Sequence, residues 1–189
     1  MINSIGNRKF IQKYLEEKGE KYPSKKQILS YIEKIKILWD KQKDEILKEI
    51  SKLTKFKWNE KKIVCYVVGV GRPFSDPLTI RTYTKSKKRF IQTLTHELIH
   101  QIQRQNKDIY AKWVKYLCEK YPEEKRLTRN HILLSAIHWE ILQKLEGEKS
   151  VKEEIKKHND FPEYKRAWDI VVEKSPKNII KKFYEVTNP

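Results

Sequence analysis

The segment Arg89–Gln105, which reads RFIQTLTHELIHQIQRQ, organises this chain of 189 residues. It contains no glycine or proline, so a single helix can run through it, with successive side chains advancing by about 100° around the axis. The opposite side from the apolar residues carries Thr93, His96 and His100 without any lysine, although the chain is rich in lysine. We therefore expect one face of this helix to be buried and the other to line a site. The residues expected to face the core are Ile91, Leu94, Leu98 and Ile102.

The motif His-Glu-x-x-His places two imidazoles, His96 and His100, one helical turn apart on the same face. Two neutral imidazoles at that spacing can bind one Zn²⁺ through ring nitrogens at about 2.0–2.1 Å. Such a metal lowers the pKa of a bound water towards ~7, and a neighbouring carboxylate can accept the proton as the water attacks a polarised carbonyl. Glu97 is therefore the predicted general base. The alternative interpretation is a surface helix with solvated or hydrogen-bonded histidines, which the apolar stripe and the lysine-free face disfavour.

A hydrolytic zinc site usually has three protein ligands and one open position, so a further ligand is expected. A second helix is predicted from about Asn130 to Leu145, and it carries His131, Ser135 and His138 on one face. We favour His131 as the third ligand, with His138 as an alternative ligand or as a group that orients one. The alternative is that both histidines are hydrogen-bonded core residues with a purely structural role. Ser135 between them is small enough to leave room for a metal.

Glycine, proline and apolar spacing divide the rest of the chain into further elements. Before the motif we predict a short amphipathic helix over Asn7–Lys18, a long helix capped by Ser24 and running to about Leu53, a buried strand over Ile63–Val70, a loop over Arg72–Pro77 and a half-buried strand over Leu78–Thr84. Ser86 is the expected cap of the histidine-bearing helix.

After the motif, the same signals predict three further helical regions and one connector. These are a helix over Asp108–Tyr121, a charged connector over Glu123–Arg129, a charged helix near Val151–His158, and two helices over Phe161–Val186 that break around Ser175-Pro176. His158 is expected at the surface. Glu140 is expected to face away from the histidines and to pair with Lys144 four positions later.

The 42 lysines and arginines exceed the 25 aspartates and glutamates and give a net charge of +17. This charge favours association with polyanions such as nucleic acid, although lysines interleaved with glutamates also solvate helix faces. The basic cluster Lys85–Arg89 precedes the histidine-bearing helix and indicates either a phosphate contact or an ordinary basic loop.

Cysteine usage and hydropathy indicate a cytoplasmic protein. Cys65 and Cys118 lie far apart, and no Cys-x-x-Cys pair occurs, so neither a disulfide framework nor a zinc ribbon is indicated. The first residues, Met1 to Glu17, are charged throughout, and no run approaches the ~20 apolar residues of a membrane span. We therefore expect no membrane partner.

This arrangement resembles a zincin-type zinc metallopeptidase, in which a small sheet precedes a helix bearing His96, Glu97 and His100 and a later helix supplies another ligand. The resemblance covers roughly Lys62 to Leu145. It implies that His96 and His100 bind catalytic zinc and that Glu97 polarises the water. The expected fold is α+β, a mostly helical zincin-like domain with a small β-sheet before the active-site helix. We expect a single domain over residues 1–189, with N-terminal helices over 1–60, a zincin-like core over 61–147 and C-terminal helices over 148–189.

The chain departs from the best-defined zincin families. Metzincins place glycine and histidine where this chain has Gln103 and Asn106. Thermolysin-like enzymes, which are gluzincins, take a glutamate from a motif that is absent here, although Glu119 falls at nearly the right distance. The nearest resemblance is to short intracellular proteins, SprT-like or minimal gluzincin-like. Those linked to DNA often carry a cysteine zinc ribbon, which this chain lacks.

The leading functional hypothesis is a zinc-dependent endopeptidase that acts on a peptide or protein substrate through a metal-activated water. The main rival is a basic nucleic-acid-binding protein whose metal site is structural or non-catalytic. A third possibility is an amidase or another hydrolase of a non-peptide carbonyl, because the same chemistry serves any such electrophile. The candidates for stabilising the oxyanion are Tyr83, Arg81 and His138.

Overall fold

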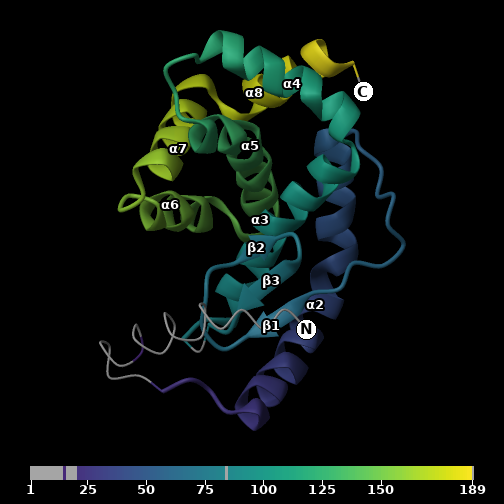
Figure 1. The fold of residues 1–189 in the computed structure, drawn as a ribbon, viewed down its shortest axis with the longest axis vertical. Helices are drawn as coiled ribbons and strands as arrows, with labels where there is room; N and C mark the ends of the chain where they lie inside the picture. Colours follow the sequence, from purple (N-terminus) through teal and green to yellow (C-terminus); the bar gives the residue numbers. More distant parts are fainter. Residues whose placement is uncertain (1–14, 16–20, 84, 189) are drawn as a thin grey trace. The chain divides into compact units, whose positions relative to one another are not determined.

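The computed structural model describes residue 15, residues 21–83 and residues 85–188 (Figure 1). It is mostly helical with one small three-stranded sheet, as expected for an α+β protein. The chain divides into two compact units, residues 1–42 with 62–97, and residues 43–61 with 98–189. The arrangement as a single domain remains a prediction. The helix predicted over Asn7–Lys18 lies outside the described residues, apart from Leu15.

The long N-terminal helix and its cap are confirmed. Helix α2 spans Lys25–Thr54. The backbone N–H of Gln27 donates to Ser24 Oγ at 3.3 Å, and the backbone N–H of Ser24 donates to Gln27 Oε1 at 2.7 Å. These reciprocal bonds form a capping box, which satisfies two backbone donors at the start of the helix.

The sheet of the first unit has the order β1-β3-β2, with β1 at Tyr66–Val68, β2 at Phe74–Ser75 and β3 at Leu78–Arg81. Strand β3 is central and pairs in parallel with β1 and antiparallel with β2. Its side chains alternate as predicted, with Leu78 and Ile80 buried and the other two partly exposed.

Two predictions for this region are wrong. The expected buried strand over Ile63–Val70 is reduced to β1, whose first residue, Tyr66, is exposed. Among the described residues it lies at an edge of the sheet and pairs only with β3, so its β-branched run does not signify a central position. The expected loop over Arg72–Pro77 contains β2, a strand too short to leave a periodic pattern.

Helix α3 spans Lys87–Gln105, and Ser86 caps it by accepting a hydrogen bond from the backbone N–H of Arg89 at 3.2 Å. The four residues predicted to face a core are all buried, at 5% exposure or less. Phe90 and Ile99 are buried as well, so the apolar face is wider than the predicted stripe. The amphipathic character of the segment is therefore confirmed.

The second unit is built around helix α5, Arg126–Glu146. The helices that pack against it are α4 at Lys107–Lys120, α6 at Glu148–Lys157, α7 at Pro162–Lys174 and α8 at Pro176–Thr187 (Figure 1). Every residue from 131 to 138 is buried, so this stretch has no solvent-facing side. The predicted helices after the motif are confirmed, including the break at Ser175, where φ is 69°.

Three predictions for the second unit are wrong. Helix α5 begins at Arg126, inside the expected connector Glu123–Arg129, because its first turn carries a single leucine among polar residues and shows no apolar periodicity. Lys144 pairs with Glu49, at 2.7 Å from Nζ to Oε1, and with Glu45, rather than with Glu140. These partners lie on the end of α2, which tertiary packing brings to α5.

His158, expected at the surface, is the third error, because its side chain is only 17% exposed. Its ring stacks on that of Tyr164 at 5.5 Å between centroids, and Nδ1 lies 2.9 Å from the backbone oxygen of Glu154. The turn that follows α6 folds α7 back over the histidine. Within the residues that the structure describes, every helix is too short or too polar to cross a bilayer.

Two leucines of α5 test whether this helix forms the centre of the second unit. Leu133 is fully buried and Leu127 is 39% exposed. We expect Leu133→Ala to lower the free energy of unfolding by about 2–5 kcal/mol, because it leaves a cavity in a packed core. The matched change Leu127→Ala should cost less than about 1 kcal/mol. Urea unfolding followed by circular dichroism measures both, and equal losses would contradict the central position of α5.

The two cysteines are free thiols that differ in exposure, Cys118 being exposed and Cys65 partly buried. Burial raises the pKa of the Cys65 thiol to about 11. At pH 8 its reactive thiolate is therefore roughly a thousandth of the total. We expect iodoacetamide to alkylate Cys65 more than about tenfold more slowly than Cys118, with the difference lost in urea. Mass spectrometry of timed digests gives the two rates, and similar rates in the folded protein would contradict this burial.

Candidate metal centre

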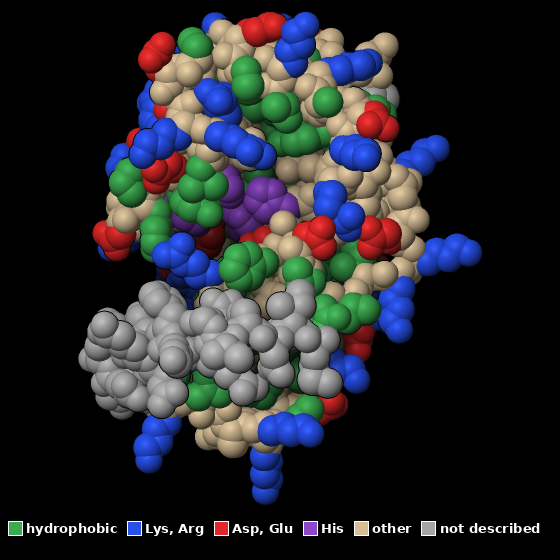
Figure 2. Space-filling view, viewed as in Figure 1, with side chains coloured by type: hydrophobic (Ala, Val, Ile, Leu, Met, Phe, Trp, Pro, Cys, Tyr) green, Lys and Arg blue, Asp and Glu red, His purple; other side chains and the backbone are tan. Residues whose placement is uncertain are grey.

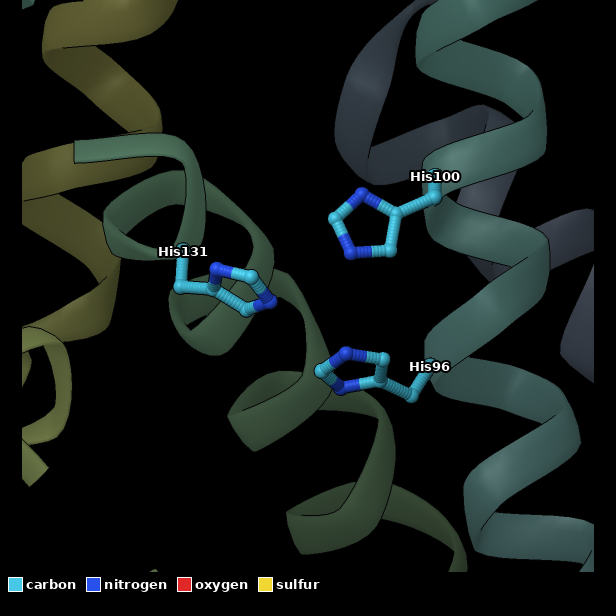
Figure 3. Close-up of side chains that lie close together, drawn as sticks. All are labelled: His96, His100 and His131. Carbon is cyan, nitrogen blue, oxygen red and sulfur yellow. The ribbon is translucent and has the colours of Figure 1, made fainter. Parts of the chain in front are cut away.

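Helices α3 and α5 bring three imidazoles together. His96 and His100 lie one turn apart on the continuous helix α3, and His131 lies in the second turn of α5. Their rings point towards one another (Figure 3). One possible ligand atom from each residue lies within 4.8 Å of the others, which is a grouping that could hold a metal ion. The two helix faces that the sequence selected thus converge.

A backbone contact sets the tautomer of His131. Its Nδ1 lies 2.8 Å from the carbonyl oxygen of Leu127, one turn earlier in the same helix. A carbonyl only accepts hydrogen bonds, so Nδ1 carries the proton and the ring's lone pair is on Nε2. Histidines that bind metals in proteins are held in this way by a hydrogen bond from the other ring nitrogen. His131 is therefore oriented as a ligand would be.

Burial keeps the imidazoles of His100 and His131 neutral. It lowers the pKa of His100 to about 3, and repulsion from His131 adds to the effect, while a hydrogen bond with the Gln103 side chain opposes it. Burial also lowers the pKa of His131 to about 4, against the opposing effect of the bond with Leu127. Only neutral imidazole can donate a lone pair to a metal. At neutral pH, both side chains are already in the form that ligation requires.

Glu97, which follows His96 in the chain, carries a buried carboxyl. The residue is 7% exposed, and burial raises the pKa of its carboxyl to about 7. A group whose pKa lies near the working pH can both take up and release a proton, which is what general acid–base catalysis needs. The sequence motif predicts Glu97 as the base, and its burial favours the same chemistry.

The site can be reached from solvent. His96 and His100 are partly exposed, whereas His131 is buried behind them on α5. Histidine side chains are visible from outside on the face drawn in Figure 2, next to hydrophobic side chains. A site for a small ion or for a reacting bond needs this combination of a buried ligand and an open side.

The aromatic neighbour of His131 is a residue that the sequence did not single out. The ring of Tyr164, on α7, lies 4.5 Å from that of His131, and His100 approaches His131 edge-on at 5.1 Å. Tyr164 also contacts His158, so an aromatic stack supports the buried ligand from behind. One helix, α6, separates Tyr164 from His131 in the chain, and no local sequence pattern indicates the contact. Gln103, by contrast, lies three positions after His100 on α3, where helical spacing alone could have indicated a neighbour.

The other residues considered from the sequence are not part of the three-histidine group. His138 is fully buried on α5 outside the three-histidine group, and burial lowers its pKa, while its attraction to Glu154 opposes that shift. Glu119 is exposed on α4, and Glu140 is partly exposed on α5. Tyr83 and Arg81 belong to the first unit, where the guanidinium lies over the tyrosine ring at 4.9 Å. The structure thus groups His96, His100 and His131 and leaves His138 apart.

The donor set fits a metal such as zinc on chemical grounds. It consists of three imidazoles, two of them held neutral by burial, and the sequence motif places the carboxyl of Glu97 one position after His96. Three protein ligands leave room for water or substrate, as in catalytic rather than structural zinc sites. Comparisons of the chain with protein-family models, with curated proteins and with solved structures each find no match.

Proposed function

We propose that this chain is a zinc-dependent metallopeptidase of zincin-like fold, which hydrolyses a peptide bond in a peptide or protein substrate. The observation that carries the proposal is the convergence of His96, His100 and His131, together with the burial of Glu97, the residue that follows His96 in the motif. A structural zinc site would call for a fourth protein ligand, and no histidine, cysteine or carboxylate joins the group among the described residues.

Each residue of the site has a distinct role in this proposal. The three imidazoles would hold Zn²⁺, which supplies a Lewis acid and lowers the pKa of a bound water. Glu97 accepts the proton of the attacking water and passes it to the leaving amine. Its raised pKa suits both steps, because the carboxyl can exist in either form near pH 7. Leu127 holds His131 through its backbone carbonyl, so that the ligand does not need to reorient.

Metal content tests the ligand set. We expect about one zinc per chain by elemental analysis of the purified protein, and its loss in His100→Ala and in His131→Ala, because each removes one of three ligands. The control is His138→Asn, which changes a buried histidine of the same helix outside the group. It should retain zinc, with its folding checked by circular dichroism.

If His131→Ala retained zinc and a folded His138→Asn lost it, His138 rather than His131 would be the third ligand. Absence of metal in the wild-type protein, even after reconstitution with Zn²⁺, would contradict the whole site. In that case the histidines are structural, and the basic character of the chain becomes the leading guide to function.

Glu97→Gln tests catalysis separately from metal binding. Glutamine keeps the size of the side chain but cannot take up a proton, so turnover should fall by about 10²–10⁴-fold while zinc remains bound. Cleavage of casein and of fluorogenic peptide libraries, followed by mass spectrometry of products, measures the change. The matched control is Glu140→Gln, a carboxyl on α5 that should leave turnover unchanged.

Three outcomes separate the proposal from its rivals. Undiminished turnover in the zinc-loaded Glu97 variant would contradict its role as base. A wild-type protein that binds zinc but cleaves no peptide would favour a non-catalytic metal site in a nucleic-acid-binding protein. Hydrolysis of simple amides without cleavage of peptides would favour an amidase.

A further inference from the structure

The three-stranded sheet of the first unit exposes two aromatic rings in one row. Tyr66 of β1 and Phe74 of β2 both pair with Thr79 of the central strand. Residues paired across strands point to the same face, so these three side chains lie side by side. The opposite face is buried through Leu78 and Ile80. Tyr66 is 56% exposed and Phe74 is 53% exposed, an unusual position for large rings on a structured face.

A group of cationic side chains continues this row. Arg81 follows Thr79 on the same face of β3, and its guanidinium lies 4.9 Å from the ring centroid of Tyr83. Arg89 lies over the same ring at 5.3 Å. The backbone N–H of Tyr83 donates to Tyr31 Oη at 3.1 Å, which ties this segment to helix α2 within the first unit. Two guanidinium groups are thus stacked against one anchored ring.

The segment that forms the sheet carries a concentrated positive charge. Residues 61–91 contain eight lysines and arginines against a single carboxylate, Asp76, a net +7 of the chain's +17. Seven of the eight cationic residues are exposed, and Arg81 is partly so. A surface of this kind attracts a polyanion and releases its counterions on binding. The cationic residues of the segment are Lys61, Lys62, Arg72, Arg81, Lys85, Lys87, Lys88 and Arg89.

We propose that this face, here called the sheet platform and defined by Tyr66, Phe74, Arg81, Tyr83 and Arg89, binds single-stranded nucleic acid. Bases stack on the rings of Tyr66 and Phe74, and the two guanidiniums contact phosphates or base planes. The bases of a duplex are covered by their neighbours in the stack, so exposed rings recognise unpaired bases. Cations alone would bind duplex and single strand alike, and the aromatic row is what selects the single strand.

This inference goes beyond the proposed peptidase activity and does not depend on it. The sheet platform contains none of the three histidines and does not include Glu97. Absence of nucleic-acid binding by the wild-type protein would leave the metal and cleavage experiments unaffected, and failure of those experiments would leave the sheet platform in place.

Fluorescence anisotropy of the full-length protein with labelled oligonucleotides tests the proposal. The probes are a fluorescein-labelled 20-nucleotide thymidine strand, a mixed-sequence strand of the same length and its duplex. We expect at least about tenfold tighter binding of the single strands than of the duplex, and at least about tenfold weaker single-strand binding in the double variant Tyr66→Ala/Phe74→Ala. The matched control is Phe161→Ala, an equally exposed ring on the second unit at 53% exposure, which should bind as the wild type does.

A second pair of variants tests whether binding depends on the charges of the sheet platform or on the net charge of the whole chain. Arg81→Gln/Arg89→Gln and Lys177→Gln/Lys181→Gln each remove two positive charges. We expect the arginine pair to weaken binding and reduce the salt dependence markedly, and the lysine pair on α8 to do so only slightly. Equal losses in the two pairs, equal affinity for duplex and single strand, or no binding at all would each overturn the proposal.

Photo-cross-linking locates the contact without any substitution, in case the aromatic variant fails to fold. A strand carrying 5-iodouracil is irradiated with the wild-type protein, and the cross-linked peptides are identified by mass spectrometry. Cross-links at Tyr66, Phe74 or Tyr83 are expected. Cross-links confined to the second unit would contradict the assignment. So would a protein dimer that depends on Tyr66 and Phe74 and forms without oligonucleotide binding.

Discussion

Burial of eight consecutive residues on helix α5 is the constraint on which the second unit depends. A helix that is covered on every side must be enclosed by others, and α4, α6, α7 and α8 supply that enclosure. The same burial has a chemical consequence for His131. Desolvation disfavours the imidazolium form, so the side chain is held neutral and ready to bind a metal. Packing and ligand chemistry therefore have one physical origin.

Helix α3 combines a buried apolar face with a face that carries the histidines. Its apolar face is buried, and its other face presents His96 and His100 to the grouping with His131. Glu97 follows His96 by one position and is also buried, which raises the pKa of its carboxyl into the range where proton transfer at neutral pH is effective. A carboxyl left in water would stay ionised and would be a weaker base. Partial burial of the polar face is thus part of the proposed chemistry.

Carboxylates offset the positive charge of the chain in some segments more than in others. In the second unit several lysines have carboxylate partners, such as Lys125 with Glu163 and Lys157 with Glu154. Residues 62–91 of the first unit have one carboxylate for seven cationic side chains. Paired charges on the helices mainly solvate and connect them, whereas an unbalanced segment creates a field that can attract a polyanion. The hydrolytic proposal and the nucleic-acid proposal therefore rest on different parts of the chain.

The sequence by itself determined the features that depend on near neighbours in the chain. The caps at Ser24 and Ser86, the buried stripe of α3, the break at Ser175 and the shared face of His96 and His100 follow from helical spacing and from side chains that bond to the backbone within a few residues. Helical spacing also predicted one face of α5 that carries both His131 and His138, but it did not decide which of the two joins His96 and His100. Only the tertiary structure decided that His131 lies against His100, that Tyr164 supports it, that Lys144 bonds to Glu49 and that β1 is an edge strand. These contacts join residues far apart in the chain, and packing of whole elements, which leaves no periodic trace in either partner, selects them.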